Sequence, residues 1–380
     1  VYDEANIESH GMYYGQESLA KQPEWEQAHM DRTVNMFERN KNHPSVAIWS
    51  LGNEAGNGIN FFHTYKYLKD QERNLMNRPV NYERALWDYN TDMYVPQYPS
   101  AAWLEEIGKK GSDRPVVPSE YSHAMGNSNG NLDLQWEAIY KYPNLQGAYI
   151  WDWVDQGMEA VDENGRIYYK YGGDYGTDMP SDGNFLCNGI VNPDRTPHPA
   201  MAEVKYTHQN FAVESVDPMK GIFKVINRQY FSNSDNYKFR YFVTENGVQI
   251  FEGTLAVSLE PQQSTRVTVP VETIKAKPGM EYFVNFEVIQ KNASRLIPAG
   301  HVVAVEQYKL PISIPRQEFT DKTGKTELKI STSDNTIAVH SSRVNFVFDR
   351  KQGVVTSYKV NGQEYFEKGF GIQPNFWRAP

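Results

Sequence analysis

The stretch Ser50-Leu-Gly-Asn-Glu-Ala-Gly-Asn-Gly58 decides how we expect the first half of this 380-residue chain to fold. An apolar run, Val46 to Leu51, leads into the stretch, stops beside Asn53 and Glu54, and gives way to glycines. A short hydrophobic strand that ends in a carboxylate is typical of the mouth of an α/β barrel, where the carboxyl ends of parallel strands carry the functional side chains. We therefore predict a barrel strand that presents Glu54 at the mouth.

The same pattern returns further along the chain, where the apolar run Pro115-Val-Val-Pro-Ser-Glu120 also ends in a glutamate. Two glutamates at the ends of separate strands suggest that a pair of carboxylates cleaves a glycosidic bond. If both strands face one mouth, the carboxyl groups would lie about 5 Å apart, which is the separation of a retaining enzyme with one nucleophile and one acid/base. Spacing alone also fits two ordinary glutamates at strand ends.

Composition narrows the classes of partner. Lys and Arg number 38 against 47 Asp and Glu, which gives a formal net charge of −9. This balance does not favour nucleic acid or an anionic membrane, and no apolar stretch reaches the ~18 residues of a membrane-spanning helix. Aromatic residues make up 13% of the chain, which suits sugar-binding platforms and large β-rich cores equally. The single cysteine, Cys187, excludes an internal disulfide and leaves the compartment open, cytoplasmic or periplasmic.

Apolar runs alternate with amphipathic stretches through the first 210 residues. The runs predicted as strands are Val1–Glu8, Val46–Glu54, Pro79–Glu83, Met93–Tyr98, Val116–Glu120 and Gly147–Trp153. Apolar side chains at helical spacing predict helices over Glu24–Arg39, Phe61–Leu75 and Leu132–Tyr142. Alternating strands and helices indicate a parallel sheet, whose commonest large closed form is the (β/α)8 TIM barrel. The runs supply about six of its eight strands, so we expect about two N-terminal strands to be missing before Val1.

The pattern changes from about Phe211 to short alternating runs separated by turn-forming pairs. The runs are Phe223–Val225, Lys238–Val243, Val248–Phe251, Arg266–Val271 and Tyr282–Val288, and after a proline-rich linker Glu327–Ile330, Thr336–His340, Asn345–Asp349 and Val354–Val360. Such runs predict antiparallel β-sandwich structure. We therefore expect three domains: 1–210 as the C-terminal part of the catalytic barrel, 211–313 as a β-sandwich, and 314–380 as the beginning of a truncated β-sandwich domain.

Three residues suggest a metal site. Glu8 and His10 are two positions apart at a strand end, so their side chains point to the same side. An ordinary surface pair explains this spacing, but a third ligand from Glu54 would complete a cation site. Few protein ligands completed by water suit Mg²⁺, and the chain has no H-E-x-x-H motif or cysteine cluster to suggest zinc.

The end of the last predicted barrel strand and the loop after it each allow a structural or a functional interpretation. The indole of Trp151 fits packing at a strand end and also stacking on the apolar face of a sugar ring. The loop with Asp182, Phe185 and Asn188 is too rich in glycine and asparagine for a core segment, and its simplest interpretation is a structured turn.

Six long motifs, in order, carry a resemblance to a known family. They are DEANIESHG (3–11), RNKNHPSVAIWSLGNEAGNG (39–58), SEYSHAMGNS (119–128), LQGAYIWDWVDQG (145–157), YGGDYG (171–176) and NPDRTPHPA (192–200). Together they resemble the bacterial β-galactosidases of glycoside hydrolase family 2. The likeness runs through the whole chain, is densest up to about residue 210, and implies that the chain is an internal segment of a longer protein.

The resemblance implies roles for the glutamates and for a cation. Glu54 matches the acid/base, on the fourth barrel strand, and Glu120 matches the nucleophile, on the seventh. Glu8, His10 and Glu54 match the ligands of Mg²⁺. The sandwich at 211–313 is implied to be immunoglobulin-like, and the domain that begins at 314 to be a second, larger β-sandwich.

The resemblance also implies a set of substrate-binding residues: Asn53, Tyr98, His123, Trp151 and Asn188. Asn53 would hold the sugar 2-hydroxyl, and Phe185, through its backbone carbonyl, would share a Na⁺ site with Asn188. Two positions depart from the family pattern. Gln97 stands where the family has methionine, and Ser181 stands where an asparagine belongs to a second magnesium site.

The sequence therefore predicts a retaining glycoside hydrolase that removes terminal non-reducing β-D-galactose. Its partners would be a lactose-like or plant or host β-galactoside and further copies of the chain in a homo-oligomer. Two alternatives stay open: another activity of the same family, such as β-glucuronidase or β-mannosidase, and a catalytically silent carbohydrate-binding homologue. Intact Glu54 and Glu120 favour the enzyme, and no motif for a uronic-acid carboxylate stands out.

Overall fold

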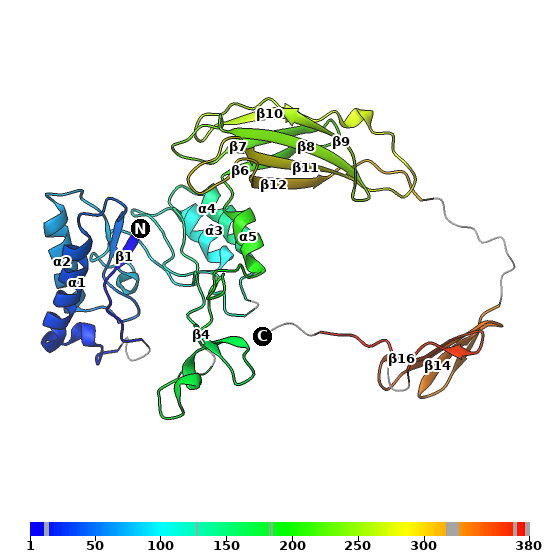
Figure 1. Cartoon of the computed structure of the whole chain (residues 1–380), viewed down its shortest axis with the longest axis horizontal. Helices are drawn as coiled ribbons and strands as arrows, with labels where there is room; N and C mark the ends of the chain where they lie inside the picture. The colour runs from blue at the N-terminus through cyan, green and yellow to red at the C-terminus, as the bar shows by residue number, and fades with distance from the viewer. Residues whose placement is uncertain are drawn as a thin grey trace. The chain divides into compact units, whose positions relative to one another are not determined.

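The computed structural model of the chain describes residues 1–10, 15–126, 128–181, 183, 185–316, 327–367 and 371–376. The chain divides into two compact units, Val1–His208 and Gln209–Ala379 (Figure 1). Asp182, which the sequence placed in a polar turn, lies outside the described residues. In the part of the chain that is described, no helix is both long and apolar enough to cross a membrane.

The first unit is built on parallel strand pairing. Strands β1 (Tyr2–Glu4), β2 (Ile48–Ser50) and β3 (Val80–Asn81) form a parallel sheet in that order. Later runs continue the parallel pairing through single bridges, among them Tyr94 with Val116, Gln97 with Glu120, and Tyr121 with Ile150. The predicted strands therefore exist as parallel neighbours, but their regular portions are much shorter than the apolar runs. Short strands leave long strand-end segments free to carry functional side chains.

The α-helices that accompany these strands are α1 (Glu26–Asn40), α2 (Ile59–Glu72), α3 (Ala101–Lys110), α4 (Leu132–Lys141) and α5 (Ala200–Thr207). The three helices predicted from apolar periodicity are confirmed as α1, α2 and α4, and their bounds agree with the prediction to within three residues at either end. Figure 1 shows α1 and α2 packed beside β1. The unit also contains the hairpin β4 (Met158–Val161) and β5 (Ile167–Lys170), and 3-10 turns at Leu19–Lys21, Pro23–Trp25, Glu83–Ala85 and Gly172–Tyr175.

A buried ion pair lies inside the apolar core around β2. Trp49 is fully buried, and its indole N–H donates to Glu72 at 2.8 Å. Glu72 also binds the Arg78 guanidinium at 2.7 Å, and both charged side chains are almost fully buried. Phe37 packs on the Trp49 ring, 5.3 Å between centroids. The pair thus joins the end of α2 to the strand that leads to Glu54.

The second unit begins with an antiparallel sandwich of two sheets, ordered β10-β7-β6 and β12-β11-β8-β9. Its strands are β6 (Phe211–Asp217), β7 (Ile222–Asn227), β8 (Tyr237–Glu245), β9 (Val248–Leu255), β10 (Ser264–Thr268), β11 (Tyr282–Gln290) and β12 (Val302–Lys309). Phe223 of β7 meets Phe286 of β11 at 4.9 Å between ring centroids, which closes one sheet on the other. The predicted run Arg266–Val271 is partly wrong, because β10 ends at Thr268 and Val271–Thr273 form a 3-10 turn.

A separate five-stranded antiparallel sheet follows, with its strands in chain order. The strands are β13 (Lys329–Thr332), β14 (Thr336–His340), β15 (Val344–Asp349), β16 (Val354–Val360) and β17 (Gln363–Glu364). The bounds of β14 and β16 coincide with the predicted runs.

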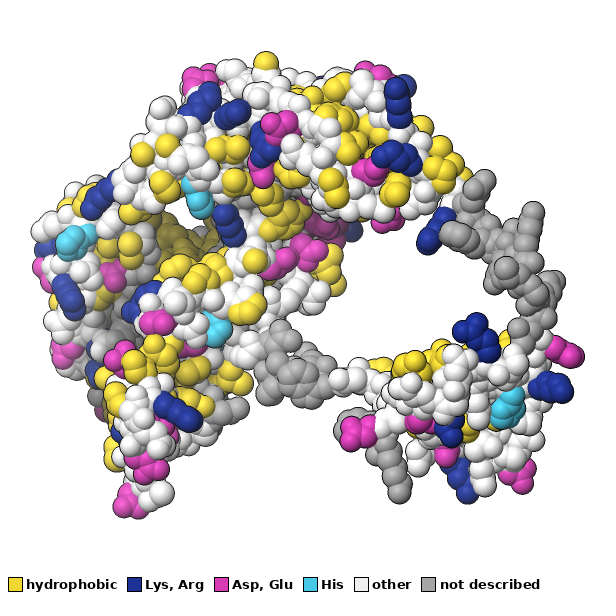
Figure 2. All heavy atoms as spheres, turned by 45° about the vertical axis from the view of Figure 1, so that its right-hand side comes forward, with side chains coloured by type: hydrophobic (Ala, Val, Ile, Leu, Met, Phe, Trp, Pro, Cys, Tyr) yellow, Lys and Arg dark blue, Asp and Glu magenta, His cyan; other side chains and the backbone are white. Residues whose placement is uncertain are grey.

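Over the face of the chain drawn in Figure 2, acidic and basic side chains are interspersed and do not gather into one patch of a single sign.

Candidate active site

The segment between β2 and Glu54 crosses very close to the segment after β1. Gly52 has φ +142°, and a Cβ at this position would lie 2.5 Å from the carbonyl oxygen of Ile7. The Asn53 N–H donates to the same carbonyl at 2.9 Å. Glycine is required here because any side chain would collide with backbone. This close crossing brings Asn53 and Glu54 next to the chain that carries Glu8.

Glu120 is held from two sides. The Tyr98 hydroxyl donates to its Oε2 at 2.5 Å, and the Gln97 amide donates to its Oε1 at 3.1 Å. Its exposed fraction is only 8%. Burial raises the pKa of the Glu120 carboxyl, the Tyr98 hydroxyl opposes that rise, and the nearby charge of Glu54 adds to it. Burial and the bond to Glu120 likewise raise the pKa of Tyr98, so this phenol stays protonated as a donor.

Glu54 lies at the centre of a second group of contacts. Its Oε1 accepts from Arg84 at 3.1 Å, and its Oε2 is 2.8 Å from Nε2 of His10. Its backbone N–H donates to Glu83 at 2.7 Å. Glu54 has φ +37°, a conformation that L-residues rarely adopt and that costs backbone energy. The surrounding hydrogen bonds offset this strain.

Glu83 is a functional candidate that the sequence reasoning did not single out. It is buried, and its Oε2 lies 2.9 Å from Nε of Arg84. Burial raises the pKa of Glu83 to about 8, with Arg84 opposing the rise. A signal existed: the predicted run Pro79–Glu83 ends in a glutamate, as do the runs before Glu54 and Glu120. Three strand-end glutamates therefore contribute to one polar cluster.

The predicted metal ligands come together. One ligand atom each from Glu8, His10 and Glu54 lie within 4.8 Å of one another. Nδ1 of His10 is 3.4 Å from Glu8, while Nε2 of His10 faces Glu54. Glu8 and His10 are exposed and Glu54 is only 14% exposed, so the cluster opens to solvent on one side. Two carboxylates and an imidazole beside solvent fit a divalent cation that keeps several waters.

The Asn53 amide is fixed in one orientation. Its Nδ2 donates to Glu8 at 3.2 Å, and its Oδ1 accepts from Gln97 at 3.1 Å. Asn53 therefore bridges the cluster around Glu8 and the pair of donors that hold Glu120.

The remaining predicted sugar residues form a second group. The His123 ring lies 5.8 Å from the Tyr98 ring and 5.6 Å from the Phe185 ring, between centroids. The Trp151 carbonyl accepts from Ala124, and the Asn188 carbonyl accepts from Asp152, the residue after Trp151. Burial lowers the pKa of His123, which favours a neutral ring.

Two buried polar atoms of this group, Oδ1 of Asn188 and Nε1 of Trp151, have no hydrogen-bond partner among the residues that the structure describes. Buried polar atoms are normally hydrogen-bonded, so an unpaired pair beside exposed aromatic rings is consistent with a site for a polar ligand or a cation. The turn interpretation of this loop is also borne out locally, since the Asn188 N–H donates to the Leu186 carbonyl at 3.0 Å.

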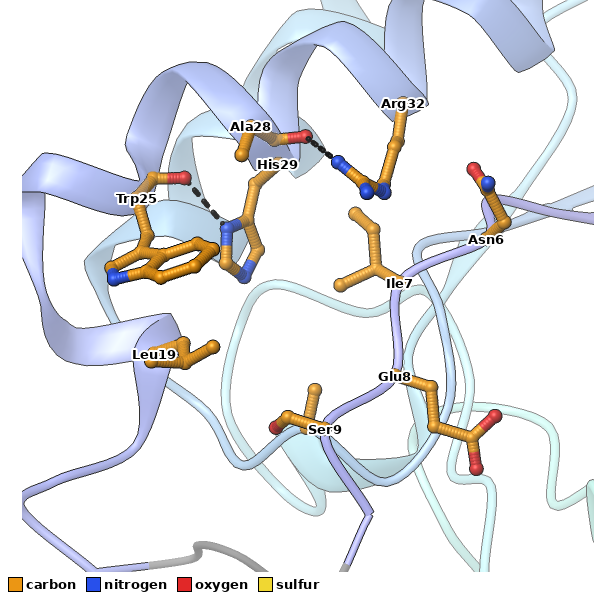
Figure 3. Close-up of a pocket in the computed structure, with 10 residues that line it drawn as sticks. Asn6, Ile7, Glu8, Ser9, Leu19, Trp25, Ala28, His29 and Arg32 are labelled. Atoms are coloured by element: carbon orange, nitrogen blue, oxygen red, sulfur yellow. Dashed lines mark hydrogen bonds between the residues drawn. The ribbon is translucent and has the colours of Figure 1, made fainter. Parts of the chain in front are cut away.

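A cavity of about 120 Å³ lies beside Glu8 but away from the catalytic candidates. Figure 3 shows Ile7, Leu19, Trp25 and His29 around it, while the Glu8 carboxylate points away from that group. Nδ1 of His29 bonds the Trp25 carbonyl at 2.8 Å. Neither Glu54 nor Glu120 lines this cavity, so we place the chemistry at the carboxylate cluster instead.

Comparisons with known proteins find matches along the whole chain. Residues 1–213 match the family model described as glycosyl hydrolases family 2, TIM barrel domain, and residues 223–311 match the model described as beta-galactosidase, domain 4. The chain is 35% identical over 404 residues to the beta-galactosidase of Pseudoalteromonas haloplanktis and 37% identical over 389 residues to that of Priestia megaterium. Each alignment covers 100% of this chain but only 38% and 37% of the respective relative. The chain thus spans less than two fifths of their length.

Proposed function

The chain belongs to glycosyl hydrolase family 2, and from that membership we propose that the whole protein is a retaining β-galactosidase. The observation that carries the proposal is the single hydrogen-bonded cluster that contains both strand-end glutamates. Arg84 binds Glu54 and also Gln97, and Gln97 binds Glu120. Two carboxylates held in one cluster can act as acid/base and nucleophile of a double displacement. Their separation of about 5 Å stays a prediction.

In the first step the Glu120 carboxylate attacks the anomeric carbon while Glu54 gives a proton to the leaving oxygen. The bond to the leaving group breaks, and a covalent glycosyl-enzyme forms on Glu120. In the second step Glu54 takes a proton from water, the water oxygen attacks the anomeric carbon, and the Glu120 carboxylate leaves. The Tyr98 hydroxyl, 2.5 Å from Glu120, stabilises the charge that returns to the nucleophile as this bond breaks.

The galactose ring would lie between the carboxylates and the aromatic group. Asn53, which is hydrogen-bonded to Glu8 and Gln97, would hold the sugar 2-hydroxyl beside the nucleophile. His123 would bind a further hydroxyl, and Trp151 would stack on the apolar ring face. The unpaired Oδ1 of Asn188 supports a polar partner in that part of the site.

We also propose that the site holds cations. Glu8, His10 and Glu54 would hold Mg²⁺, and bound there the ion would supply positive charge that orients Glu54. Phe185 and Asn188 would hold Na⁺; the unpaired buried oxygen of Asn188 fits a cation ligand. The EDTA test follows from the first site. Chelation should lower the turnover of the full-length protein and added Mg²⁺ should restore it, whereas unchanged turnover removes any role of the ion.

The finer domain division is part of the proposal. We infer barrel residues 1–210, an immunoglobulin-like sandwich at 211–313, and a further sandwich from 314. The two inner faces of the first sandwich and its seven strands support the immunoglobulin-like assignment.

The test is a panel of nitrophenyl β-glycosides offered to the full-length protein, with the first-formed anomer followed by NMR. We expect the β-galactoside to be cleaved fastest and β-galactose to appear first. Faster cleavage of a glucuronide or mannoside would assign the chain to another activity of the family. Appearance of the α anomer first would overturn retention, and no turnover of any glycoside would favour a silent carbohydrate-binding homologue.

A further inference from the structure

Gln97 makes three hydrogen bonds that a methionine, the residue of the resembling family at this position, is unable to make. Both amide hydrogens are used: Nε2 donates to Glu120 at 3.1 Å and to Asn53 at 3.1 Å. Its Oε1 accepts from Nη2 of Arg84 at 2.5 Å. The backbone of Gln97 pairs with Glu120 in a parallel bridge, so the side chain starts from a fixed point beside the nucleophile.

Arg84 completes the link to the other glutamate. Its Nη2 donates to Glu54 at 3.1 Å as well as to Gln97, and its Nε lies 2.9 Å from Glu83. Glu83 in turn accepts from the backbone N–H of Glu54 at 2.7 Å. The guanidinium is a rigid fork, so these contacts fix the direction of the Glu54 carboxylate relative to Gln97. The Arg84 side chain is about one quarter exposed, at 27%.

Three consecutive bonds, from Glu120 to Gln97, to Arg84 and to Glu54, connect the two catalytic candidates. Gln97 also orients Asn53, because its N–H occupies the Asn53 oxygen and leaves the Asn53 nitrogen directed at Glu8. Arg84 places one positive charge against the carboxyl groups of Glu54 and Glu83.

We propose that Gln97 and Arg84 act as a coupled pair of positioning residues that sets the mutual orientation of Glu120 and Glu54 in this chain. Gln97 contacts Glu120, Arg84 contacts Glu54, and the two residues are hydrogen-bonded to each other, so the position of each depends on the other. Glu120 receives Gln97 on one oxygen and Tyr98 on the other, which fixes the plane of the carboxylate that attacks the sugar. The inference rests on the proposed function, since the orientation matters only for glycosyl transfer to Glu120.

The experiment is a double-mutant cycle in the full-length protein, with Gln97→Met, Arg84→Met and the double variant. Misplacing a reacting group by about 1 Å costs ~10²-fold in rate, so each single variant should lower kcat on a β-galactoside by about 10- to 100-fold. KM should stay within about 3-fold, because these residues position the reacting groups and do not bind the sugar. The kcat of the double variant should be only slightly below that of the less active single variant, because either change breaks the same link.

Matched controls separate positioning from a general loss of structure. Gln71→Met and Arg73→Met make the same exchanges at exposed positions on α2 and just after it, and should leave kcat unchanged. If a methionine variant fails to fold, Gln97→Leu and Arg84→Lys replace it. Arg84→Lys keeps the charge but not the fork, so it should recover the melting temperature of the wild type while kcat stays low.

The outcomes are distinct. Unchanged kcat in Gln97→Met, or a double variant whose loss equals the product of the two single losses, overturns the coupling while the β-galactosidase proposal stands. Full recovery of kcat by Arg84→Lys shows that charge alone suffices and also overturns the positioning role. A wild-type protein that hydrolyses no glycoside overturns both proposals together.

Discussion

The sandwich of the second unit and the carboxylate cluster of the first unit are held together by different forces. In the sandwich, β11 alternates buried and half-buried residues along its whole length, and Phe223 and Val284 are fully buried in one continuous apolar cluster. The cluster in the first unit instead gathers Glu54, Glu83 and Glu120 at the ends of very short paired segments. Burial of apolar area stabilises the sandwich, whereas burial of the carboxylates opposes stability.

The difference teaches where each region is vulnerable. A sandwich core loses stability when a side chain is truncated, because a cavity forms. The carboxylate cluster loses function when one partner is removed, and it can gain stability by the same change, because natural active sites keep groups that are costly to bury. Each prediction below therefore compares an effect on turnover with an effect on unfolding.

Glu120→Gln should produce the largest effect in turnover and the opposite effect in stability. Without the nucleophile no glycosyl-enzyme forms, so kcat should fall by at least about 10⁴-fold on every substrate. Burial raises the pKa of Glu120 above its ordinary value of 4.5. Below that ordinary value wild type and variant should be equally stable, and as pH rises the wild type should lose stability relative to the variant. Urea titration of the two proteins between pH 4 and pH 8 measures this difference.

The contrary result would be informative. If Glu120→Gln were less stable than wild type at pH 8, the bonds from Tyr98 and Gln97 would outweigh the cost of burying the charge. Glu120→Asn serves as a control, because its shorter amide should not reach both Tyr98 and Gln97.

Glu54→Gln should have a smaller effect that depends on the leaving group. Acid/base assistance contributes about 10²- to 10⁴-fold, so lactose-like substrates should be slowed by that factor. Substrates with activated leaving groups need little protonation and should be spared in the first step. Azide needs no base, so it should restore their turnover and yield the β-glycosyl azide. A β product from azide rescue of the Glu120 variant instead would reverse the two roles.

Phe223→Ala and Phe37→Ala compare the same truncation in the two units. Both rings are buried, and each packs against an aromatic neighbour, Phe286 or Trp49. Each change should lower the free energy of unfolding by about 3–5 kcal/mol. Only Phe37→Ala should also lower kcat per folded molecule, because Trp49 lies on the strand that leads to Glu54. Denaturant titration gives the first quantity, and active-site titration with a slow substrate gives the second.

Loss of kcat per folded molecule in Phe223→Ala would contradict the division of labour between the two regions. Equal kcat in Phe37→Ala would show that β2 keeps its place without the ring.

The sequence predicted much of this arrangement, and what it missed depends on contacts distant in the chain. Apolar periodicity was enough for α1, α2, β14 and β16, because a buried stripe or an alternating face is a local signal. Helix α3 was missed although Ser100 caps it by accepting from the Trp103 N–H at 3.1 Å. Strand β12 was missed because its polar half, ending at Lys309, breaks the alternation.

Within the site, the sequence predicted that Glu8, His10 and Glu54 converge, and their ligand atoms do so. The contacts of Arg84 were not predictable, because they depend on the turn after β3. That turn contains Leu86 at φ +49°, a conformation no local pattern announces. The position of Gln97 was noted only as a departure, and its three partners come from separate strand ends.

The smallest effect compares two groups of the same composition, each a glutamate bonded to an exposed lysine and to a tyrosine. Glu105 accepts from Lys141 and Tyr142 at 2.7 Å each, and Glu245 accepts from Lys277 and Tyr282 at 2.7 Å each. The bond from Lys141 is the main cause that lowers the pKa of Glu105 to about 2, and the bond from Lys277 lowers the pKa of Glu245. Exposed pairs of this kind contribute little, so Glu105→Gln and Glu245→Gln should each lower the melting temperature only slightly.

The pH dependence gives this last comparison its test. A lowered pKa stabilises the fold above the ordinary value of about 4.5 and loses that contribution as the pH falls toward the folded value. The difference between wild type and Glu105→Gln should therefore be full at pH 7, shrink toward pH 2, and weaken in 1 M salt. The Glu105 variant should show the larger difference, since Lys109 also approaches that carboxylate at 3.1 Å. If the difference in melting temperature between wild type and variant does not change with pH or salt, the bond to the tyrosine, and not the charge, stabilises each group.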